Sequence, residues 1–480
     1  MLTPALHQWS PRMIDGLPVL DGLFEDFAAD PVACMQYLQR SCGDVAALQQ
    51  DGQQLVFVFS PEFNRQVLTQ SDDFHSYFFA MRGPKRSALR ELTSGLLSMN
   101  GDEHTRQRRI VKSAFSRQAI AGYTGMVRVL TSQLLEQWTI GEVRDIAAET
   151  TRLMLAITSS MLFGMQDLEL AIETGEMVDE WARANHALGS AALVARSDAF
   201  EKYEALLGLS ERIAARIRQM VELKRSEGVS CDDVLSLLIR AKDGGAALTE
   251  SQLVGQAALV FAAGHMTTAH TMAWLLYLLA QHPDWQRRVA DESSGEPDDV
   301  VSAGLAANVT SPFERVIRES MRVLSGSAYS QRRAARDVRI GPALVRGGSM
   351  VIFSQYMTHR RADLYDDPEV FNPDRWLTAR PSAYEYLPFG AGPRLCIGAP
   401  LAMAIIRTVI PMMLEKARFS VVASSHINAR IISTMLAPVP GIPLRLAAPG
   451  SRIEPAVVSG NILNVVQIPE LTRQNARRAA

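Results

Sequence analysis

Residues 388–400 read "PFGAGPRLCIGAP" and surround a single cysteine, Cys396, with three glycines and three prolines. The stretch predicts a tightly bent loop, because glycine adopts backbone conformations that are closed to other residues. Pro400 suits the first turn of a helix, where a missing N–H costs nothing. Backbone N–H groups and the helix dipole can stabilise a thiolate at such a helix start. The loop therefore predicts a thiolate that faces a planar cofactor. The alternative interpretation is a buried free cysteine in an ordinary glycine-rich turn.

Composition narrows the classes of protein. The chain has 480 residues, 47% of them hydrophobic, and a formal net charge of −2. A net charge this close to zero does not indicate binding to nucleic acid or to an anionic membrane. The four cysteines form no CxxC pair, which argues against a disulfide framework or a zinc site: Cys34, Cys42, Cys231 and Cys396. The N-terminus lacks a basic segment followed by an apolar one, so no signal peptide is expected. We therefore expect a cytoplasmic protein without a nucleic-acid partner.

A long apolar stretch, residues 253–280, predicts a central helix. Thr249 and Gln252 have the spacing of a capping box at its start, and Pro283 ends it. Its length alone would permit a membrane span. Polar side chains in its middle argue against that alternative, because they are costly in hydrocarbon: Gln256, His265, Thr267, Thr268 and His270. We expect a helix through the core of a large domain and no membrane span.

Around this helix the sequence predicts a mainly α fold with a smaller β-rich region. Two short apolar runs around Asp51-Gly52 indicate a hairpin, and helical patterns fill most of residues 61–322. Strand-like pieces follow near residues 336–354 and 417–447. No linker separates two halves. We predict one domain over residues 1–447 and a peripheral tail over residues 448–480, whose end is expected to be disordered.

The segment "FGAGPRLCIG" resembles the haem-binding signature of the cytochrome P450 family, F-G-x-G-x-R-x-C-x-G, at every fixed position. Further segments resemble that family in the right order: "GDEHTRQRR" (101–109), "AAGHMTTA" (262–269), "ESMR" (319–322), "RRAARDV" (332–338) and "FNPDRW" (371–376). The resemblance spans about residues 16–446. It implies a single P450-like domain with haem b and O2 as cofactors, and Cys396 as the axial iron ligand.

One acidic and one basic residue are predicted to stabilise the segment beneath the haem loop. Glu319 and Arg322 are one helical turn apart and can meet on one face. The resemblance adds Arg375 as the third member of a buried ion-pair triad. The alternative is an exposed pair of little energetic value.

The resemblance also implies a set of haem contacts. The propionates would be bound by His104 and Arg108, again one turn apart, together with Arg332 and Arg394. For Arg332, a solvated basic turn is the alternative. Other residues expected to border the cofactor are Phe389, Gly398, Ala263 and Gly264.

Oxygen activation in the family usually needs an acid followed by a threonine on the central helix. Here Met266 occupies the acid position and is followed by Thr267 and Thr268, the two predicted catalytic residues. A thioether carries no proton. Proton delivery is therefore expected through water, Thr268, His265 or a substrate hydroxyl, unless Met266 is only a packing residue and another route serves. A smaller departure is Ile405, where relatives often have a glutamate.

These expectations together predict a monooxygenase for an apolar or amphiphilic small molecule. The expected substrate pocket comprises Phe78, Phe79, Leu96, Ala263 and Thr267. Electrons are expected from NAD(P)H through a separate ferredoxin and ferredoxin reductase, or equivalents, because no flavin or nicotinamide domain is recognisable. The alternatives are peroxide-driven or non-hydroxylating chemistry on the same haem, and a non-catalytic haem-binding or sensing protein.

Overall fold

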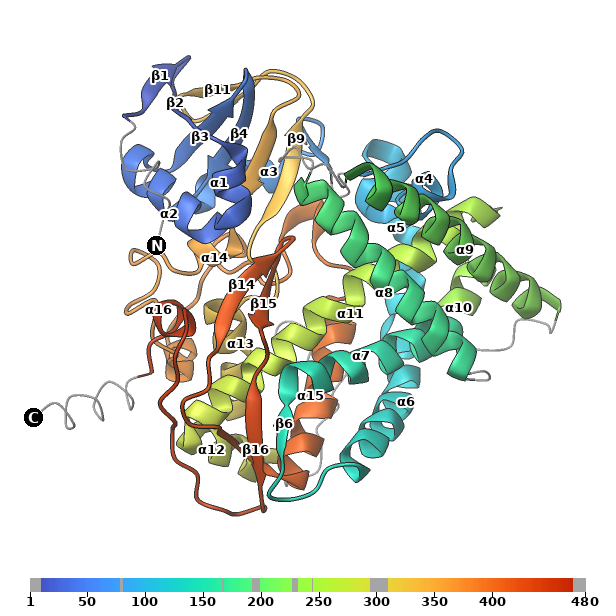
Figure 1. The fold of residues 1–480 in the computed structure, drawn as a ribbon. Coiled ribbons are helices and arrows are strands. Elements are labelled where there is room, and N and C mark those ends of the chain that lie inside the picture. The colour runs from blue at the N-terminus through green and yellow to red at the C-terminus, as the bar shows by residue number, and fades with distance from the viewer. Residues whose placement is uncertain are drawn as a thin grey trace, which may run out of the picture.

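The long apolar stretch forms α11 (Glu250–Gln281), which crosses the centre of the molecule (Figure 1). Its start is the predicted capping box: the Thr249 hydroxyl accepts from the Gln252 N–H, and the Gln252 side chain accepts from the Thr249 N–H. The helix ends at Gln281, because His282 precedes a proline and therefore disfavours the helical conformation. Apart from a few positions in its middle, α11 is buried from Leu253 to Gln281. It therefore forms the axis on which the other elements pack.

The structure is a computed structural model that describes residues 10–77, 81–165, 168–191, 199–226, 232–243, 245–293 and 310–468. Within these ranges no helix is both long and apolar enough to cross a membrane. The core position that the sequence predicts for α11 is seen instead in the burial of most of its residues.

Fifteen further α-helices are described. They are α1 (Phe24–Ala29), α2 (Pro31–Cys42), α3 (Pro61–Thr69), α4 (Ala88–Leu92), α5 (Gly101–Lys112), α6 (Arg117–Glu136), α7 (Ile146–Phe163), α8 (Leu168–Ala191), α9 (Ala199–Ser226), α10 (Val234–Arg240), α12 (Pro283–Ser293), α13 (Pro312–Val323), α14 (Gln355–Thr358), α15 (Ala399–Lys416) and α16 (Ile462–Val465). Short 3₁₀ turns include η4 (Pro373–Leu377) and η5 (Gly392–Arg394).

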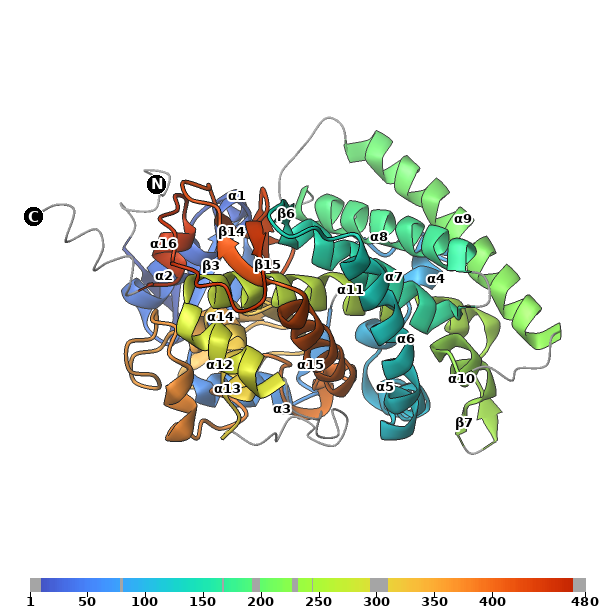
Figure 2. The same cartoon turned by 90° about the horizontal axis from the view of Figure 1, so that it is seen from below.

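The largest sheet has the strand order β1-β2-β3-β4-β12-β9-β5 and lies at one side of the molecule, away from α8 and α9 (Figure 2). Its strands are β1 (Arg12–Ile14), β2 (Leu17–Asp21), β3 (Val45–Gln50), β4 (Gln53–Val58), β5 (Phe74–Ser76), β9 (Ser330–Ala334) and β12 (Met350–Phe353). The predicted hairpin is confirmed: β3 and β4 pair antiparallel around Asp51 and Gly52. Both residues have positive φ, as the two-residue turn requires.

Smaller sheets complete the β region. One has the order β13-β16-β6, and three are hairpins of two strands. Their strands are β6 (Val143–Asp145), β7 (Lys242–Asp243), β8 (Ala246–Ala247), β10 (Val338–Ile340), β11 (Ala343–Val345), β13 (Arg418–Val421), β14 (Asn428–Ile432), β15 (Met435–Val439) and β16 (Pro443–Ala447). The predicted fold class, mainly α with a smaller β-rich region in one domain around a long central helix, is confirmed.

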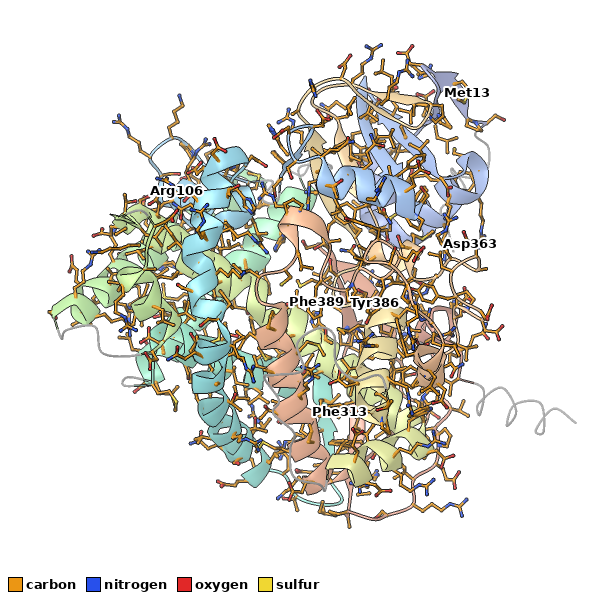
Figure 3. All side chains as sticks on the ribbon, turned by 180° about the vertical axis from the view of Figure 1, so that it is seen from behind. Met13, Arg106, Phe313, Asp363, Tyr386 and Phe389 are labelled. Carbon is orange, nitrogen blue, oxygen red and sulfur yellow. The ribbon has the colours of Figure 1, made fainter. Side chains whose placement is uncertain are left out.

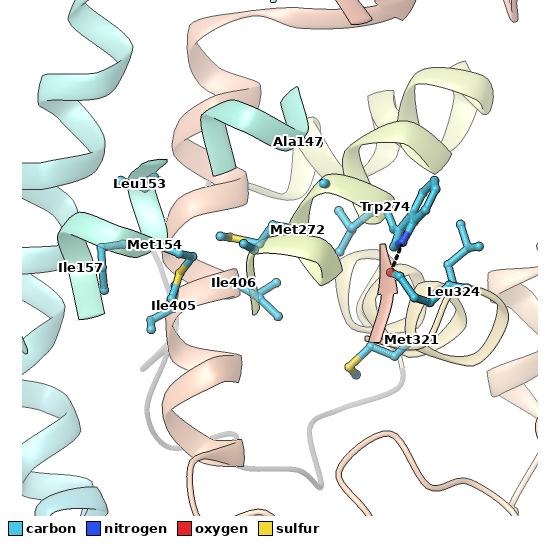
Figure 4. Close-up of a cluster of buried hydrophobic side chains, with 14 of the residues drawn as sticks. Ala147, Leu153, Met154, Ile157, Met272, Trp274, Met321, Leu324, Ile405 and Ile406 are labelled. Carbon is cyan, nitrogen blue, oxygen red and sulfur yellow. Dashed lines mark hydrogen bonds between the residues drawn. The ribbon is translucent and has the colours of Figure 1, made fainter. Parts of the chain in front are cut away.

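The main core lies where α7, α11, α13 and α15 meet (Figure 4). Met272 and Trp274 of α11 are fully buried there, and the Trp274 indole donates to the Leu436 carbonyl at 2.9 Å. Ile405 lies near Met154 and Ile157 in this core (Figure 4). An apolar side chain fits this position, since a carboxylate among such neighbours would need a partner.

The first part of the segment after residue 447 packs on the main body. Val458, Ile462 and Val465 are buried in the same core as α11, and residue 467 forms a parallel bridge with Val370. The described tail residues are thus less peripheral than the sequence indicated. The domain boundary at residue 447 stays a prediction, and the expected disorder of the last residues falls at 469–480, outside the described ranges.

Adjacent residues of α16 test this packing. Ile462 is fully buried, whereas Leu463 is 44% exposed. Ile462→Ala should lower the free energy of unfolding by about 2–5 kcal/mol, because it opens a cavity in the core. Leu463→Ala should change it by less than about 0.5 kcal/mol. Denaturant titration of both variants provides the measurement, and equal losses would show that the tail does not depend on this contact.

Candidate functional site

Cys396 lies on a loop that is closed by its own backbone. The Cys396 N–H donates to the Phe389 carbonyl at 2.9 Å. Gly390 and Gly392 have positive φ, and a Cβ on Gly392 would come within 2.6 Å of the Leu68 carbonyl oxygen. Only glycine satisfies both demands at position 392. The loop then runs through η5 into α15, which starts at Ala399, so Cys396 precedes a helix N-terminus as the sequence predicts.

Two opposing effects act on the Cys396 thiol. The pKa of the thiol is raised, because burial outweighs the N–H group of Gly398, the positive charge of Arg108 and the N–H group of Ala399, which act to lower it. These three groups are donors and charge that a metal-bound thiolate can use. The side chain is nevertheless accessible. A group that is deep in the molecule but accessible lines an internal space, and both properties suit a metal ligand.

Glu319 is the centre of a buried ionic network. Arg322 binds it through two nitrogens, at 3.0 and 2.8 Å, and the Arg375 Nε donates to it at 2.9 Å. Glu319 and Arg322 are fully buried, and Arg375 is 9% exposed. The Trp376 indole and the Asn372 N–H complete its shell at 3.0 Å each. The alternative of an exposed pair is therefore excluded for these side chains.

The network connects α13 to the segment before the cysteine loop. Arg322 also donates to the carbonyls of His359, Pro368 and Val370. Arg375 donates to the carbonyls of Asp366 and Asp367 as well. Two guanidinium groups thus satisfy backbone carbonyls over residues 359–370, a region with little regular structure. Charge-assisted hydrogen bonds of this kind hold an irregular backbone segment that lacks the regular hydrogen bonds of a helix or sheet.

The structure brings together the four residues predicted to bind propionates. His104 is buried on α5, and its pKa is lowered to about 4 by burial and by the charges of Arg394, Arg108 and Arg332. Burial and Arg394 lower the pKa of Arg332 to about 10. Burial and Arg108 do the same to Arg394. Three guanidinium groups and an imidazole from α5, β9 and η5 therefore share one partly buried place.

The arginines of this cationic cluster (His104, Arg108, Arg332 and Arg394) have no carboxylate partner at ion-pair distance among the residues that the structure describes. Arg108 donates to the Leu395 carbonyl at 2.5 Å, and Arg394 donates to the Met99 carbonyl at 2.6 Å and to Asn100 at 2.9 Å. Mutual repulsion between buried cations is unfavourable unless anions bind. Two carboxylates of a haem are anions of the required kind, so the cluster fits that cofactor.

The middle of α11 offers the second half of a cofactor site. Ala263 is exposed although the helix around it is buried, and Gly264 and Thr267 are partly exposed. A Cβ on Gly264 would meet no atom within 4 Å. The Thr267 hydroxyl donates to the Ala263 carbonyl at 2.8 Å. One face of α11 therefore borders open space, with a hydroxyl beside it.

His265 lies on a different face of α11 from Thr267. Its Nε2 is 3.2 Å from the Thr151 carbonyl oxygen on α7, and its Nδ1 is 3.3 Å from Asp179 on α8. The side chain is 2% exposed. Both ring nitrogens thus face α7 and α8, which makes His265 an anchor between helices. Among the expected proton routes, this geometry favours those through water, Thr268 or a substrate hydroxyl over the one through His265.

The predicted substrate pocket is described only in part. Phe78 and Phe79 lie outside the described residues. Leu96 is 4% exposed and belongs to the core, and its N–H donates to Gln256. Ala263 and Thr267 border open space. Sequence reasoning missed Asn100, which orients Arg394, because no local pattern connects residues that are almost 300 positions apart.

A comparison with protein families matches residues 16–442 to the cytochrome P450 family. A Streptomyces melanosporofaciens protein, cyclooctat-9-en-7-ol 5-monooxygenase, is 28% identical over 78% of this chain and 82% of its own. Pentalenene oxygenase of Streptomyces avermitilis is 27% identical over 79% of this chain and 84% of its own. The chain therefore belongs to the cytochrome P450 family, and it is a haem-dependent monooxygenase that uses O2.

Solved structures agree on the fold. The haem domain of cytochrome P450DA superposes with a TM-score of 0.74 at 22% identity, covering 88% of this chain and 94% of its own. A retinoic acid-bound cyanobacterial protein, CYP120A1, gives a TM-score of 0.72 at 19% identity, covering 86% and 93%. At these identities the likeness concerns the fold alone.

Removing the Glu319 carboxylate should be far more damaging than removing an exposed one. Glu319→Ala leaves two buried guanidinium groups without a counter-charge and should cost roughly 3–5 kcal/mol, with loss of haem incorporation. Asp21→Ala is the matched control, because the Arg12–Asp21 pair is 53% and 63% exposed and should cost less than about 1 kcal/mol. Denaturant titration and haem content are the measurements. Normal haem content with an unchanged midpoint in Glu319→Ala would contradict the bracing role.

His104 should make the stability of the haem-free protein depend on pH, and the direction of the effect follows from its pKa. Its folded-state pKa of about 4 lies below the ordinary value of 6.5. The unfolded chain therefore takes up a proton near pH 6.5 that the folded, haem-free chain takes up only near pH 4. Stability should fall across this window as the pH is lowered, and His104→Asn should show a smaller fall. Urea unfolding of haem-free protein at the two ends of the window measures it. Identical pH dependence in both proteins would contradict the assignment.

Proposed function

We propose that this cytochrome P450 inserts one oxygen atom of O2 into an apolar or weakly amphiphilic, terpene-like small molecule, with electrons from a separate ferredoxin and ferredoxin reductase. The observation that carries the proposal is the open face of α11 at Ala263, Gly264 and Thr267. It supplies small apolar surface and one hydroxyl, a lining suited to a mostly apolar substrate.

The cofactor that fits the described residues is haem b. Cys396 would bind the iron, and the cationic cluster would bind the two propionates through charge-assisted hydrogen bonds. When bound, a haem with a thiolate ligand supplies the reductive activation of O2. Phe389, Gly398, Ala263 and Gly264 are proposed to border the ring. Gly398 is partly exposed, and a Cβ there would come within 3.9 Å of the Cys396 sulfur, which supports a place for it beside the ligand.

The proposed substrate class rests on two supports. Two bacterial relatives carry the names of cyclooctat-9-en-7-ol and pentalenene as substrates, which supports a terpene-like class for this chain. The accessible part of α11 is formed by Ala263, Gly264 and the Thr267 side chain, so it offers few groups for a polar substrate to bind. Phe78, Phe79 and Leu96 remain predictions for the rest of the lining.

Thr267 is proposed to orient the last donor in proton delivery. Its hydroxyl is bonded to the Ala263 carbonyl at 2.8 Å, which leaves its oxygen lone pairs free to accept from a water on the open side. Met266 is partly exposed and carries no proton. Thr268 is only 6% exposed, so it is less accessible than Thr267. We therefore assign proton delivery to Thr267 with water or a substrate hydroxyl.

The proposed electron donor is a separate protein. The tip of the cysteine loop is exposed at Gly392 and Pro393, which allows a partner to approach the loop that carries Cys396. NAD(P)H would thus act through the partner proteins and not on this chain directly.

Oxygen labelling tests the reaction. Purified protein should be screened for compounds that change the spin state of the haem, starting with cyclic terpenes and their alcohols. A binding compound is then incubated with surrogate ferredoxin, reductase, NADPH and ¹⁸O2. One labelled oxygen in the product is expected. Product oxygen that comes only from added labelled peroxide would favour peroxide-driven chemistry, and spectral binding without substrate-dependent NADPH consumption would favour a sensing role.

The role of Thr267 can be separated from helix stability. Thr267→Ala should raise the hydrogen peroxide released per NADPH and lower product yield by roughly tenfold or more, within the range of general acid–base effects. Thr271→Ala is the matched control, because Thr271 makes the same bond to a carbonyl one turn back but is buried. Coupling efficiency is the measurement.

Met266→Glu completes this series. It restores a carboxyl at the usual position, but its partly buried place should raise the pKa of that group. We expect altered coupling rather than simple improvement. If the variants at 266, 267 and 271 all couple like the unmodified protein, neither Met266 nor Thr267 takes part in proton delivery.

A further inference from the structure

His359 connects two parts of the site that the sequence treats separately. It follows α14 and is fully buried. Its backbone carbonyl accepts from the Arg322 Nη1 at 2.8 Å. Its ring Nε2 accepts from the Leu387 N–H at 2.7 Å. One residue thus contacts the ion-pair network with its backbone and the start of the cysteine loop with its side chain.

The hydrogen bonds continue from Leu387 to the metal ligand. The Leu387 carbonyl accepts from the Gly390 N–H at 3.0 Å, and the Phe389 carbonyl accepts from the Cys396 N–H at 2.9 Å. Tyr386 and Phe389, on either side of this point, are labelled in Figure 3. A continuous series of bonds therefore runs from Glu319 through Arg322, His359 and the loop backbone to Cys396.

The Leu387 N–H needs this acceptor. Leu387 is fully buried, so water cannot replace the imidazole as a partner. A buried N–H without an acceptor is strongly unfavourable. The loop can thus adopt its bend at Pro388 only while an acceptor stands at the position of the His359 Nε2.

We propose that His359 is a positioning residue for the thiolate ligand: as a neutral imidazole with its proton on Nδ1, it couples the Glu319–Arg322–Arg375 network to the loop that presents Cys396. The proposal rests on the haem-thiolate assignment, but not on the identity of the substrate or on turnover. The tautomer follows from the contact, since Nε2 accepts a hydrogen bond and must be unprotonated.

The surroundings keep the ring neutral. Burial, followed by the charges of Arg322 and Arg360, lowers the pKa of His359 to about 3, and only the backbone of Arg322 acts in the opposite direction. The Tyr386 ring lies 5.3 Å away, centroid to centroid. An imidazolium here would present an N–H to the Leu387 N–H and break the contact, so neutrality is required by the geometry as well.

Two conservative substitutions separate the acceptor from general packing. The amide of glutamine reaches the position of the imidazole Nε2, so His359→Gln can still accept from Leu387. The shorter amide of asparagine lies near the position of Nδ1, so His359→Asn is equally polar but cannot reach. His270→Gln is the burial control, because His270 is 6% exposed on α11 and has no hydrogen bond to the described residues of the loop.

The test combines hydrogen exchange with a spectroscopic signature. Amide exchange is followed in haem-loaded protein at Leu387 and Cys396, and the reduced carbon monoxide complex reports thiolate ligation through its red-shifted Soret band. We expect His359→Asn to exchange both amides about tenfold faster or more and to lose part of the red-shifted band, since an unpaired buried donor favours local opening. His359→Gln and His270→Gln should retain the band and slow exchange at both amides.

Every outcome bears on the proposal. The proposal is supported if His359→Gln keeps slow amide exchange and the red-shifted band while His359→Asn does not. It is also supported if only His359→Asn fails to bind haem. Equal behaviour of the two variants overturns it. If both fail to fold, the unmodified protein decides: slow exchange at Leu387, comparable to Cys396, supports the contact, and exchange at the rate of a free amide overturns it. Absence of labelled product with these results intact would refute only the proposed reaction.

Discussion

The carboxylate of Glu319 is the interaction on which the site depends. It accepts five hydrogen bonds, from Arg322 twice, Arg375, the Trp376 indole and the Asn372 N–H. The two arginines then donate to backbone carbonyls over residues 359–370, where regular structure is sparse. A buried carboxylate is favourable only when it is paired in this way. The result is a fixed backbone over residues 359–370, next to the loop that carries Cys396.

The proposed cofactor site combines a cluster of cationic side chains with the thiolate of a cysteine deep in the molecule, and each is electrostatically unfavourable in the protein alone. The cationic cluster gathers three guanidinium groups and an imidazole without carboxylate partners among the described residues. Cys396 has N–H groups and Arg108 near its sulfur, and these favour the thiolate against the cost of burial. The chain alone leaves both arrangements strained electrostatically. A ligand with a cationic metal and two carboxylates would relieve them together, which explains why stability and cofactor binding should be tightly linked.

Features that are determined by neighbouring residues could be predicted from the sequence, whereas contacts between residues far apart in the chain could not. The Asp51-Gly52 hairpin and the Thr249 capping box are local, and both were confirmed. The cysteine loop is also local, because its glycines and Pro400 shape it directly. By contrast, the acceptor role of His359 joins residues 28 positions apart. No periodicity reveals such a contact, since it exists only once the folded chain has brought the two residues together.

Other differences have the same cause. The face of α11 on which His265 lies could be read from helical spacing, but its partners Thr151 and Asp179 come from two other helices. The tail after residue 447 looked peripheral because its composition gives little sign of packing, yet Ile462 fills a place in the core. Burial of this kind is decided by the shape of the surface that receives the segment, which a local pattern does not contain.

Ligation of the haem iron by Cys396 can be measured by X-ray absorption at the iron edge of haem-loaded protein, because the spectrum reports the atoms bound to the metal. We expect one sulfur neighbour in the unmodified protein and none in Cys396→Ala. A sulfur neighbour that persists in Cys396→Ala, or only light-atom neighbours in the unmodified protein, would contradict ligation by Cys396.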